Sequence, residues 1–198
     1  MQNRIEPLEP ELTYHIFNRA NGNDNIFTSD ENYRFFLAKY RHYLNSIADT
    51  FCYCLMPNHF HFLVRIKSAR ELNSLKDFPK FETVDKLLSK QFSNLFSSYT
   101  QSFNKVMGRK GSLFMKSFKR KRVANEKYFI KLVHYIHYNP VESGLKENIE
   151  DWKYSSYRAM ITSKPTDLLR DEVLDYFSDR QNFIYCHRHP AELAGVDF

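Results

Sequence analysis

Two histidines one residue apart raise the question of what chemistry this chain could perform. His59 and His61 flank Phe60 in LMPNHFHFLV, a stretch otherwise rich in the apolar and aromatic residues that strands prefer. Residues i and i+2 of a strand face the same side of a sheet, so the two imidazoles would stand together. Two imidazoles can bind a divalent metal, but such a pair alone is more often structural.

A second pair with chemical potential lies in HYIHYNPVESGL, residues 134–145. Tyr135 and Asn139 are four residues apart, so on a helix they share a face. A tyrosine hydroxyl can act as a nucleophile, and an asparagine oxygen can ligate Mg²⁺ or Mn²⁺. A structural interpretation is also open, because Tyr135 could belong to the core and Asn139 could cap a short helix ending at Gly144. Pro140 also disfavours helical geometry at Asn139, which makes the shared face approximate.

Two other patterns compete with these residues. Tyr138 is the main rival nucleophile, although it would lie about 300° around the helix from Tyr135. His187 and His189 in CHRH repeat the spacing of the first histidine pair, but in a polar, arginine-interrupted stretch. That second pair is expected to lie on the surface.

The charge is unevenly distributed along the 198 residues, whose net charge is +6. Residues 1–146 hold 23 Lys and Arg against 13 Asp and Glu, whereas residues 147–198 hold 6 against 10. The stretch KSFKRKR, residues 116–122, places five cations in seven positions. A basic body with abundant Tyr and Phe favours a polyanionic partner that also stacks on aromatic rings.

The cellular setting follows from what the sequence lacks. No apolar run approaches the roughly 20 residues of a membrane helix, and the N-terminus has no hydrophobic signal core. The three cysteines have no disulfide framework spacing, so they are expected to be reduced thiols. We therefore expect a cytoplasmic protein without a membrane partner.

Hydrophobic periodicity predicts an α+β fold. The expected strands cover residues 13–20, 50–56, 59–66 and 111–123. Ser29 is expected to open a first helix that runs to residue 47, a second helix covers residues 85–108, and a third covers residues 125–138 with Asn125 as its N-cap. The order β-α-β-β-α-β is the ferredoxin-like or RRM-like plan, an antiparallel sheet with helices on one face. The helix over residues 125–138 is additional to this plan and carries Tyr135, and a C-terminal extension follows it. We interpret residues 67–85 as an inserted loop, and residues 161–198 as an acidic extension of a domain spanning 1–160.

Five blocks along the chain together resemble one family. They are YHIFNRANGNDNIF, YCLMPNHFHFLV, GSLFMKSFKRKRV, YIHYNPVESGL and DWKYSSY, and they span roughly residues 13–160. In this order they resemble the REP-associated tyrosine transposases, which are single-tyrosine HUH transposases related to the smallest insertion-sequence transposases. The resemblance implies the ferredoxin-like fold, and it places the HUH motif on His59, Phe60 and His61.

The resemblance also implies an activity and a site. Tyr135 falls on the nucleophile, and His59, His61 and Asn139 fall on the ligands of a divalent metal, Mg²⁺ or Mn²⁺. Such a transposase cuts and rejoins single-stranded DNA beside hairpin-forming palindromes through a 5′-phosphotyrosine, usually as a homodimer. The family setting implies a bacterial protein that associates with the nucleoid when bound to DNA.

Backbone contacts to the DNA are expected to be mainly electrostatic. The candidate residues are Arg19, Arg65, Lys116, Lys119, Arg120, Lys121 and Arg122. Strand alternation allows only some of them to face the DNA together. Two rival functions stay open at this point: a non-catalytic nucleic-acid-binding module on an RRM-like sheet, and a small metal-dependent hydrolase that does not use the tyrosine.

Overall fold

The computed structural model describes residues 6–75 and 81–189 and contains one four-stranded antiparallel sheet. The strands are β1 (Thr13–Arg19), β2 (Ala48–Met56), β3 (His59–Ile66) and β4 (Lys119–Arg122). Their spatial order is β2-β3-β1-β4, which is the ferredoxin-like arrangement. The predicted fold class is therefore confirmed.

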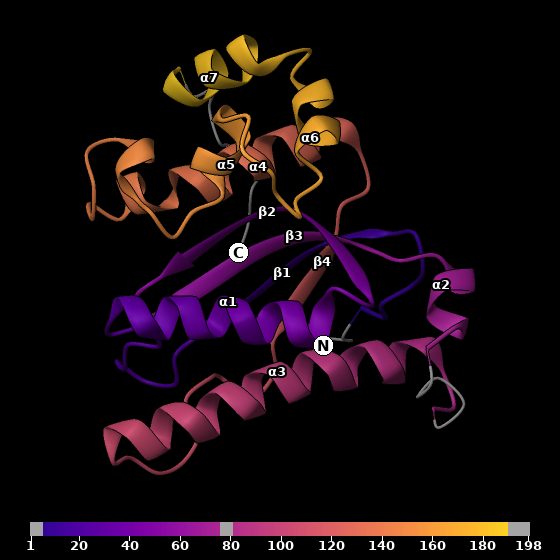
Figure 1. The fold of residues 1–198 in the computed structure, drawn as a ribbon, viewed down its shortest axis with the longest axis vertical. Helices are drawn as coiled ribbons and strands as arrows, with labels where there is room; N and C mark the ends of the chain where they lie inside the picture. Colours follow the sequence, from indigo (N-terminus) through magenta and orange to yellow (C-terminus); the bar gives the residue numbers. More distant parts are fainter. Residues whose placement is uncertain (1–5, 76–80, 190–198) are drawn as a thin grey trace, which may run out of the picture.

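Helices cover both faces of this sheet, as Figure 1 shows. On one side lie α1 (Asp30–Leu44) and α3 (Val84–Met107), packed on an aromatic core that includes Phe36, Phe60 and Phe62. On the other side lie α4 (Glu126–Glu142), the short 3₁₀ helix η2 (Ile149–Asp151), α5 (Tyr157–Ile161), α6 (Arg170–Tyr176) and α7 (Arg180–Arg188). These elements and the outer face of β2 enclose a second hydrophobic cluster. In the described part of the chain, no helix is long and apolar enough to cross a membrane.

Local sequence signals explain where the main helices begin and end. Ser29 caps α1 by accepting a hydrogen bond from the amide of Asn32, and Asn125 caps α4 in the same way through Tyr128. The helix α3 ends at Gly108, whose φ of 62° is a left-handed conformation that glycine adopts without strain. The predicted caps at Ser29 and Asn125 and the predicted end of α3 at Gly108 are confirmed. However, α1 ends at Leu44, before the predicted residue 47, and α4 runs past residue 138 to Glu142.

The interpretation of residues 67–85 as an inserted loop missed a helix near the start of the segment. A short helix, α2 (Ala69–Asn73), forms there because Ser68 and Glu71 make a capping box, and α3 already begins at Val84. Residues 76–80 of this segment lie outside the described residues.

The predicted strand at 111–123 is much shorter in the structure. Only Lys119–Arg122 pairs regularly with β1, although Phe114 forms an isolated bridge with Ala20. Leu113 and Phe114 are buried in the core, and the exposed residues 115–117 lie outside the regular pairing with β1. The apolar residues of this segment therefore anchor a loop, and their alternation with polar residues does not extend the strand.

Helix α4 continues through Pro140 to Glu142, which contradicts the alternative in which Asn139 starts a new helix. Proline lacks an N–H, so its presence costs one helical hydrogen bond near the C-terminal end of α4. Tyr135 and Asn139 consequently lie one turn apart on the same helix. Gly144, with a φ of 68°, follows directly after the end of α4.

Candidate active site beside the sheet

Strand pairing brings β1 and β3 side chains to one face of the sheet. Phe17 lies opposite His61, and Arg19 lies opposite His59, so all four point to the side away from α1 and α3. Helix α4 packs on this same side, mainly over β2 and at one end over β3. Helix α4 does not cover the part of this face that β1 and β4 form, and a cleft opens there.

His61 is held in place by a neighbour that the sequence analysis missed. The Nε2 atom of His15 lies 2.9 Å from Nδ1 of His61, and the ring of Phe17 stacks on both imidazoles. Both histidines are buried, and burial lowers the pKa of His15 to about 3 and that of His61 well below its usual range. Both are therefore neutral at pH 7, which is the state in which histidine ligates metal.

A chain of side-chain hydrogen bonds links the sheet to α4. Nε2 of His59 lies 3.0 Å from Oδ1 of Asn139, and Nδ2 of Asn139 donates to the hydroxyl of Tyr135 at 2.9 Å. On its other side, Nδ1 of His59 lies 2.7 Å from Oδ1 of Asn58. The pKa of His59 is lowered, first by burial and also by the charge of Arg19. The structure thus brings together His59, Asn139 and Tyr135.

Tyr135 sits between this network and His61. Its ring meets the His61 ring edge-on with centroids 5.4 Å apart, and only 8% of the residue is exposed. Burial raises the pKa of its hydroxyl, as does the charge of Glu142, whereas the hydrogen bond from Asn139 opposes the rise. The rival Tyr138 instead stacks on His134, on another side of the helix.

A cleft of about 670 Å³ opens in front of His59, His61 and Tyr135. Three of the predicted DNA-contact residues line it, namely Arg19, Lys116 and Lys119. Lys116 and Lys119 come from the loop before β4 and from its first residue, and both are exposed. The cleft therefore has two imidazoles and a phenol at its floor and cations at its rim.

The remaining predicted DNA-contact residues lie elsewhere. Arg120 is on the α1 and α3 side of the sheet, where its side chain is 8% exposed and pairs with Asp85. Arg65 pairs with Glu172 of α6 at 2.7 Å. Lys121 is on the cleft side but beyond the cleft, where its ammonium lies over the ring of Tyr128. Arg122 is exposed at the end of β4, on the same side as Arg120.

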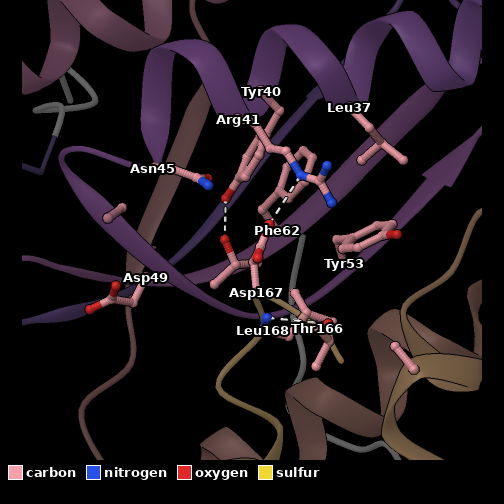
Figure 2. Close-up of a pocket in the computed structure, with 13 residues that line it drawn as sticks. Leu37, Tyr40, Arg41, Asn45, Asp49, Tyr53, Phe62, Thr166, Asp167 and Leu168 are labelled. Atoms are coloured by element: carbon pink, nitrogen blue, oxygen red, sulfur yellow. Dashed lines mark hydrogen bonds and ion pairs between the residues drawn. The ribbon is translucent and has the colours of Figure 1, made fainter. Parts of the chain in front are cut away.

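A separate cavity of about 180 Å³ lies on the opposite face of the sheet. It is bounded by α1, by β2 and by residues 166–168, and Figure 2 shows the ion pair between Arg41 and Asp167 across it. The hydroxyls of Tyr40 and Thr50 meet beneath at 2.7 Å. No residue predicted to take part in catalysis, metal binding or DNA binding lines this cavity, so it is not part of the candidate site.

The expectation that CHRH lies on the surface is wrong for His187. His187 is 1% exposed and its Nε2 lies 3.0 Å from Nδ1 of His137 in α4, while His137 also contacts the hydroxyl of Ser156. His189 is exposed, as expected. The helical spacing of Phe183 and His187 places both against α4, and this spacing is a signal that the sequence analysis could have used.

Comparisons with known proteins add an independent view of the chain. No family model matches it. A Haemophilus influenzae protein that is provisionally named as a REP-associated tyrosine transposase is 25% identical over 111 residues, which cover 55% of this chain. The matched stretch spans 58% of the length of that relative.

A solved structure shares the fold. It is described as a REP-associated tyrosine transposase bound to a REP hairpin, and it matches with a TM-score of 0.58 over 84% of this chain and 90% of its own chain. The sequence identity is 18%, so this match supports the fold alone. The curated relative and the shared fold together confirm the predicted resemblance: the chain is similar to the REP-associated tyrosine transposases.

Proposed function

We propose that this protein is a transposase of the single-tyrosine type that cleaves and rejoins single-stranded DNA beside hairpin-forming palindromes. The observation that carries the proposal is the linked set His59–Asn139–Tyr135, placed beside His61 at the floor of a cleft with a basic rim. A protein that only binds nucleic acid has no need of this combination. The Haemophilus influenzae relative, whose name describes a transposase, also supports this proposal.

The donor atoms fit a divalent metal. When Nδ1 of His59 donates a hydrogen bond to Asn58, Nε2 carries a lone pair that faces Oδ1 of Asn139 at 3.0 Å. Both atoms are then acceptors, and a cation that both ligate would stabilise this close approach. The 3.0 Å separation of these two donor atoms would allow both to hold one divalent ion. Among the described residues, no three His, Cys, Asp or Glu side chains form a metal site, so the amide of Asn139 is the third ligand that we propose.

We assign the ion as Mg²⁺ or Mn²⁺ because the set mixes imidazole nitrogen with amide oxygen. When bound, such an ion supplies Lewis acidity toward a phosphate oxygen. His15 acts as a positioning residue, since its contact with Nδ1 of His61 fixes which nitrogen faces the cleft.

Tyr135 is the proposed nucleophile. Its raised pKa keeps the phenol protonated in the resting protein, and the N–H of Asn139 orients its oxygen. Attack forms the Oη–P bond and breaks the P–O3′ bond; the phenolic proton is lost and the departing 3′-oxygen gains a proton. The product is a 5′-phosphotyrosine and a free 3′-hydroxyl. Because a phenolate leaves more readily than an alkoxide, the link can be reversed for rejoining without ATP.

Backbone phosphates of the DNA would meet the rim of the cleft. Arg19, Lys116 and Lys119 line it and are retained in the proposal, whereas Arg65 and Arg120 already have carboxylate partners within the chain. If a rim cation contacts a phosphate, its neutralisation lowers the salt slope of binding by about one unit.

All four side chains of the proposed site lie together within one chain. The homodimer therefore stays a prediction that size-exclusion chromatography with light scattering can test. The domain boundary near residue 160 also stays a prediction, and α7 contributes His187 to the layer behind α4.

The decisive experiment is a search for the covalent intermediate. The full chain is incubated with Mn²⁺ and a library of 3′-labelled hairpin oligonucleotides with randomised single-stranded flanks. A labelled adduct that survives a denaturing gel is expected, since the 5′-phosphotyrosine retains the 3′ fragment. Tyr135→Phe removes the adduct, and Tyr138→Phe on the same helix is the matched control that keeps it.

The same experiment separates the rival functions. Binding without any adduct would favour the non-catalytic module, and cleavage without an adduct would favour the hydrolase. An adduct that survives Tyr135→Phe would move the nucleophile to another residue. Chelation of the metal is expected to abolish the adduct, and added Mn²⁺ to restore it.

A further inference from the structure

A second groove of about 460 Å³ lies next to the catalytic cleft, on the other side of residues 115–117. One wall is α3 and the other is the loop that precedes β4. The two hollows share four lining residues, which are Asn18, Met115, Lys116 and Ser117. The side-chain amide of Asn18 donates to the carbonyl of Met115 at 3.3 Å and so ties this dividing wall to β1.

The wall formed by α3 carries a row of small polar side chains. Ser89, Ser93 and Ser97 recur at every fourth position and continue into Thr100 and Gln101, so they form one stripe along the helix. Ser93 and Ser97 are exposed, whereas the apolar face of α3 is buried against the sheet. Hydroxyls and amides of this kind are common partners of phosphate and sugar oxygens in nucleic-acid complexes.

The groove has a paired cation at its end and an exposed cation on its rim. Arg120 lines it, with Nη1 donating to Asp85 and to the hydroxyl of Ser89, while its buried Nε meets no acceptor in the described part of the chain. The oxygen of Asp85 that Arg120 contacts also accepts a hydrogen bond from the amide of Leu8. Lys116 stands exposed on the dividing wall.

The floor of the groove is aromatic. Phe96 lies between Phe114 and Phe118, with ring centroids 5.2 Å and 5.6 Å away, and Phe118 is only half-buried. The guanidinium of Arg120 lies 5.3 Å from the centre of the Phe118 ring. Exposed rings beside cations are the pattern on which unpaired bases stack.

We propose that this groove binds the single-stranded DNA that flanks the hairpin, with its phosphates along the serine stripe of α3 and a base over Phe118. The inference rests on the proposed function, and it adds a second contact region that is separate from the metal ligands and the nucleophile. The strand would pass over residues 115–117, which explains why the loop that divides the two hollows carries an exposed lysine.

The test measures binding alone, with the full-length Tyr135→Phe protein, in EDTA, by fluorescence anisotropy. Hairpins with flanks of two or of eight nucleotides on each side are compared. We expect the longer flanks to tighten binding, and the double change Ser93→Glu and Ser97→Glu to remove about tenfold of that gain through like-charge repulsion. The matched control is Gln91→Glu with Asn94→Glu, which adds the same charge to α3 on its α1 side, away from the groove.

Each outcome decides between the two proposals. A gain from the longer flanks that the groove variant loses and the control keeps supports the inference. Hairpin binding that is independent of flank length, or an equal loss in variant and control, would overturn the groove but leave the catalytic site standing. An absence of any hairpin binding would overturn both.

Discussion

Two groups of three histidines lie on either side of the helix that carries Tyr135. The sheet group consists of His15, His59 and His61, and the helix group consists of His134, His137 and His187. All six have a lowered pKa, with burial as the largest cause in each case. By residue type and burial alone the two groups look alike.

Their surroundings separate them. The sheet group borders a cleft and is joined to an amide and a phenol, whereas the helix group is enclosed by Ser156, Tyr157 and Phe183. The first arrangement faces open space for a ligand, whereas the second packs α4 against α7 and the segment around Ser156. A pair of histidines therefore acquires chemical meaning from the side chains beyond it, and the spacing of the pair does not supply that meaning.

The largest effect is expected from His61→Ala in the sheet group. Loss of this proposed metal ligand should slow adduct formation at least about 100-fold, because even changes to residues behind metal ligands commonly cost 10–100-fold. Mn²⁺ binding followed by electron paramagnetic resonance gives an independent readout. An adduct rate within about threefold of the wild type would remove His61 from the site.

Asn139→Ala should slow adduct formation by about 10–100-fold, since it removes both the contact to His59 and the hydrogen bond to Tyr135. Saturating Mn²⁺ should restore only part of the rate, because the orientation of the phenol is lost as well. Full rescue by Mn²⁺ would show that Asn139 acts through the metal alone.

In the helix group, His187→Ala should affect stability instead of chemistry. The change removes a buried ring together with its hydrogen bonds to His137 and to the carbonyl of Phe183, so the free energy of unfolding should fall by about 2–4 kcal/mol. Urea titration measures this loss. At a temperature where the variant is folded, Mn²⁺ affinity should stay within about twofold, and a tenfold drop would mean that the two groups are coupled.

The smallest expected effect is on how steeply the free energy of unfolding depends on pH. The pKa of His187 is held at about 3 by burial, against about 6.5 in an unfolded chain, so the unfolded state binds more protons between these values. The contribution of His187 to the free energy of unfolding is therefore fully present above pH 6.5. It is lost as the pH falls toward 3, by at most about 1.4 kcal/mol per pH unit. Urea titrations from pH 7 to 4.5 should show a shallower slope in His187→Gln. A slope in His187→Gln as steep as in the wild type would contradict this assignment.

Much of this molecule was predictable because local physics decides it. Alternation located the strands, and capping residues such as Ser29 and Asn125 located helix starts. The short helix α2 was predictable in principle from Ser68 and Glu71, but a polar segment conceals such a capping box. The strand at 111–123 was overestimated because Leu113 and Phe114 are buried by tertiary packing that no local pattern reports.

The candidate site likewise has parts that local sequence predicts and parts that depend on tertiary packing. His59 and His61 share a face by strand geometry, and Tyr135 and Asn139 share one because α4 runs through Pro140. The partnership of His15 with His61 could not be predicted, since it depends on the register between β1 and β3, which are far apart in the sequence. Arg120 faces α3 for the same reason, although the sequence places it within a cationic run.

The packing of α7 against α4 matters when a gene for a protein of this kind is judged intact from its motifs. A copy that ends shortly after residue 161 would retain every motif residue, from His59 to Asn139, and would pass a motif search as functional. It would also lack the helix that supplies His187 and Phe183, and would expose the back of the helix that carries Tyr135. We expect such a reading frame to encode an inactive protein, so the decay of these genes can begin outside every motif by which they are recognised.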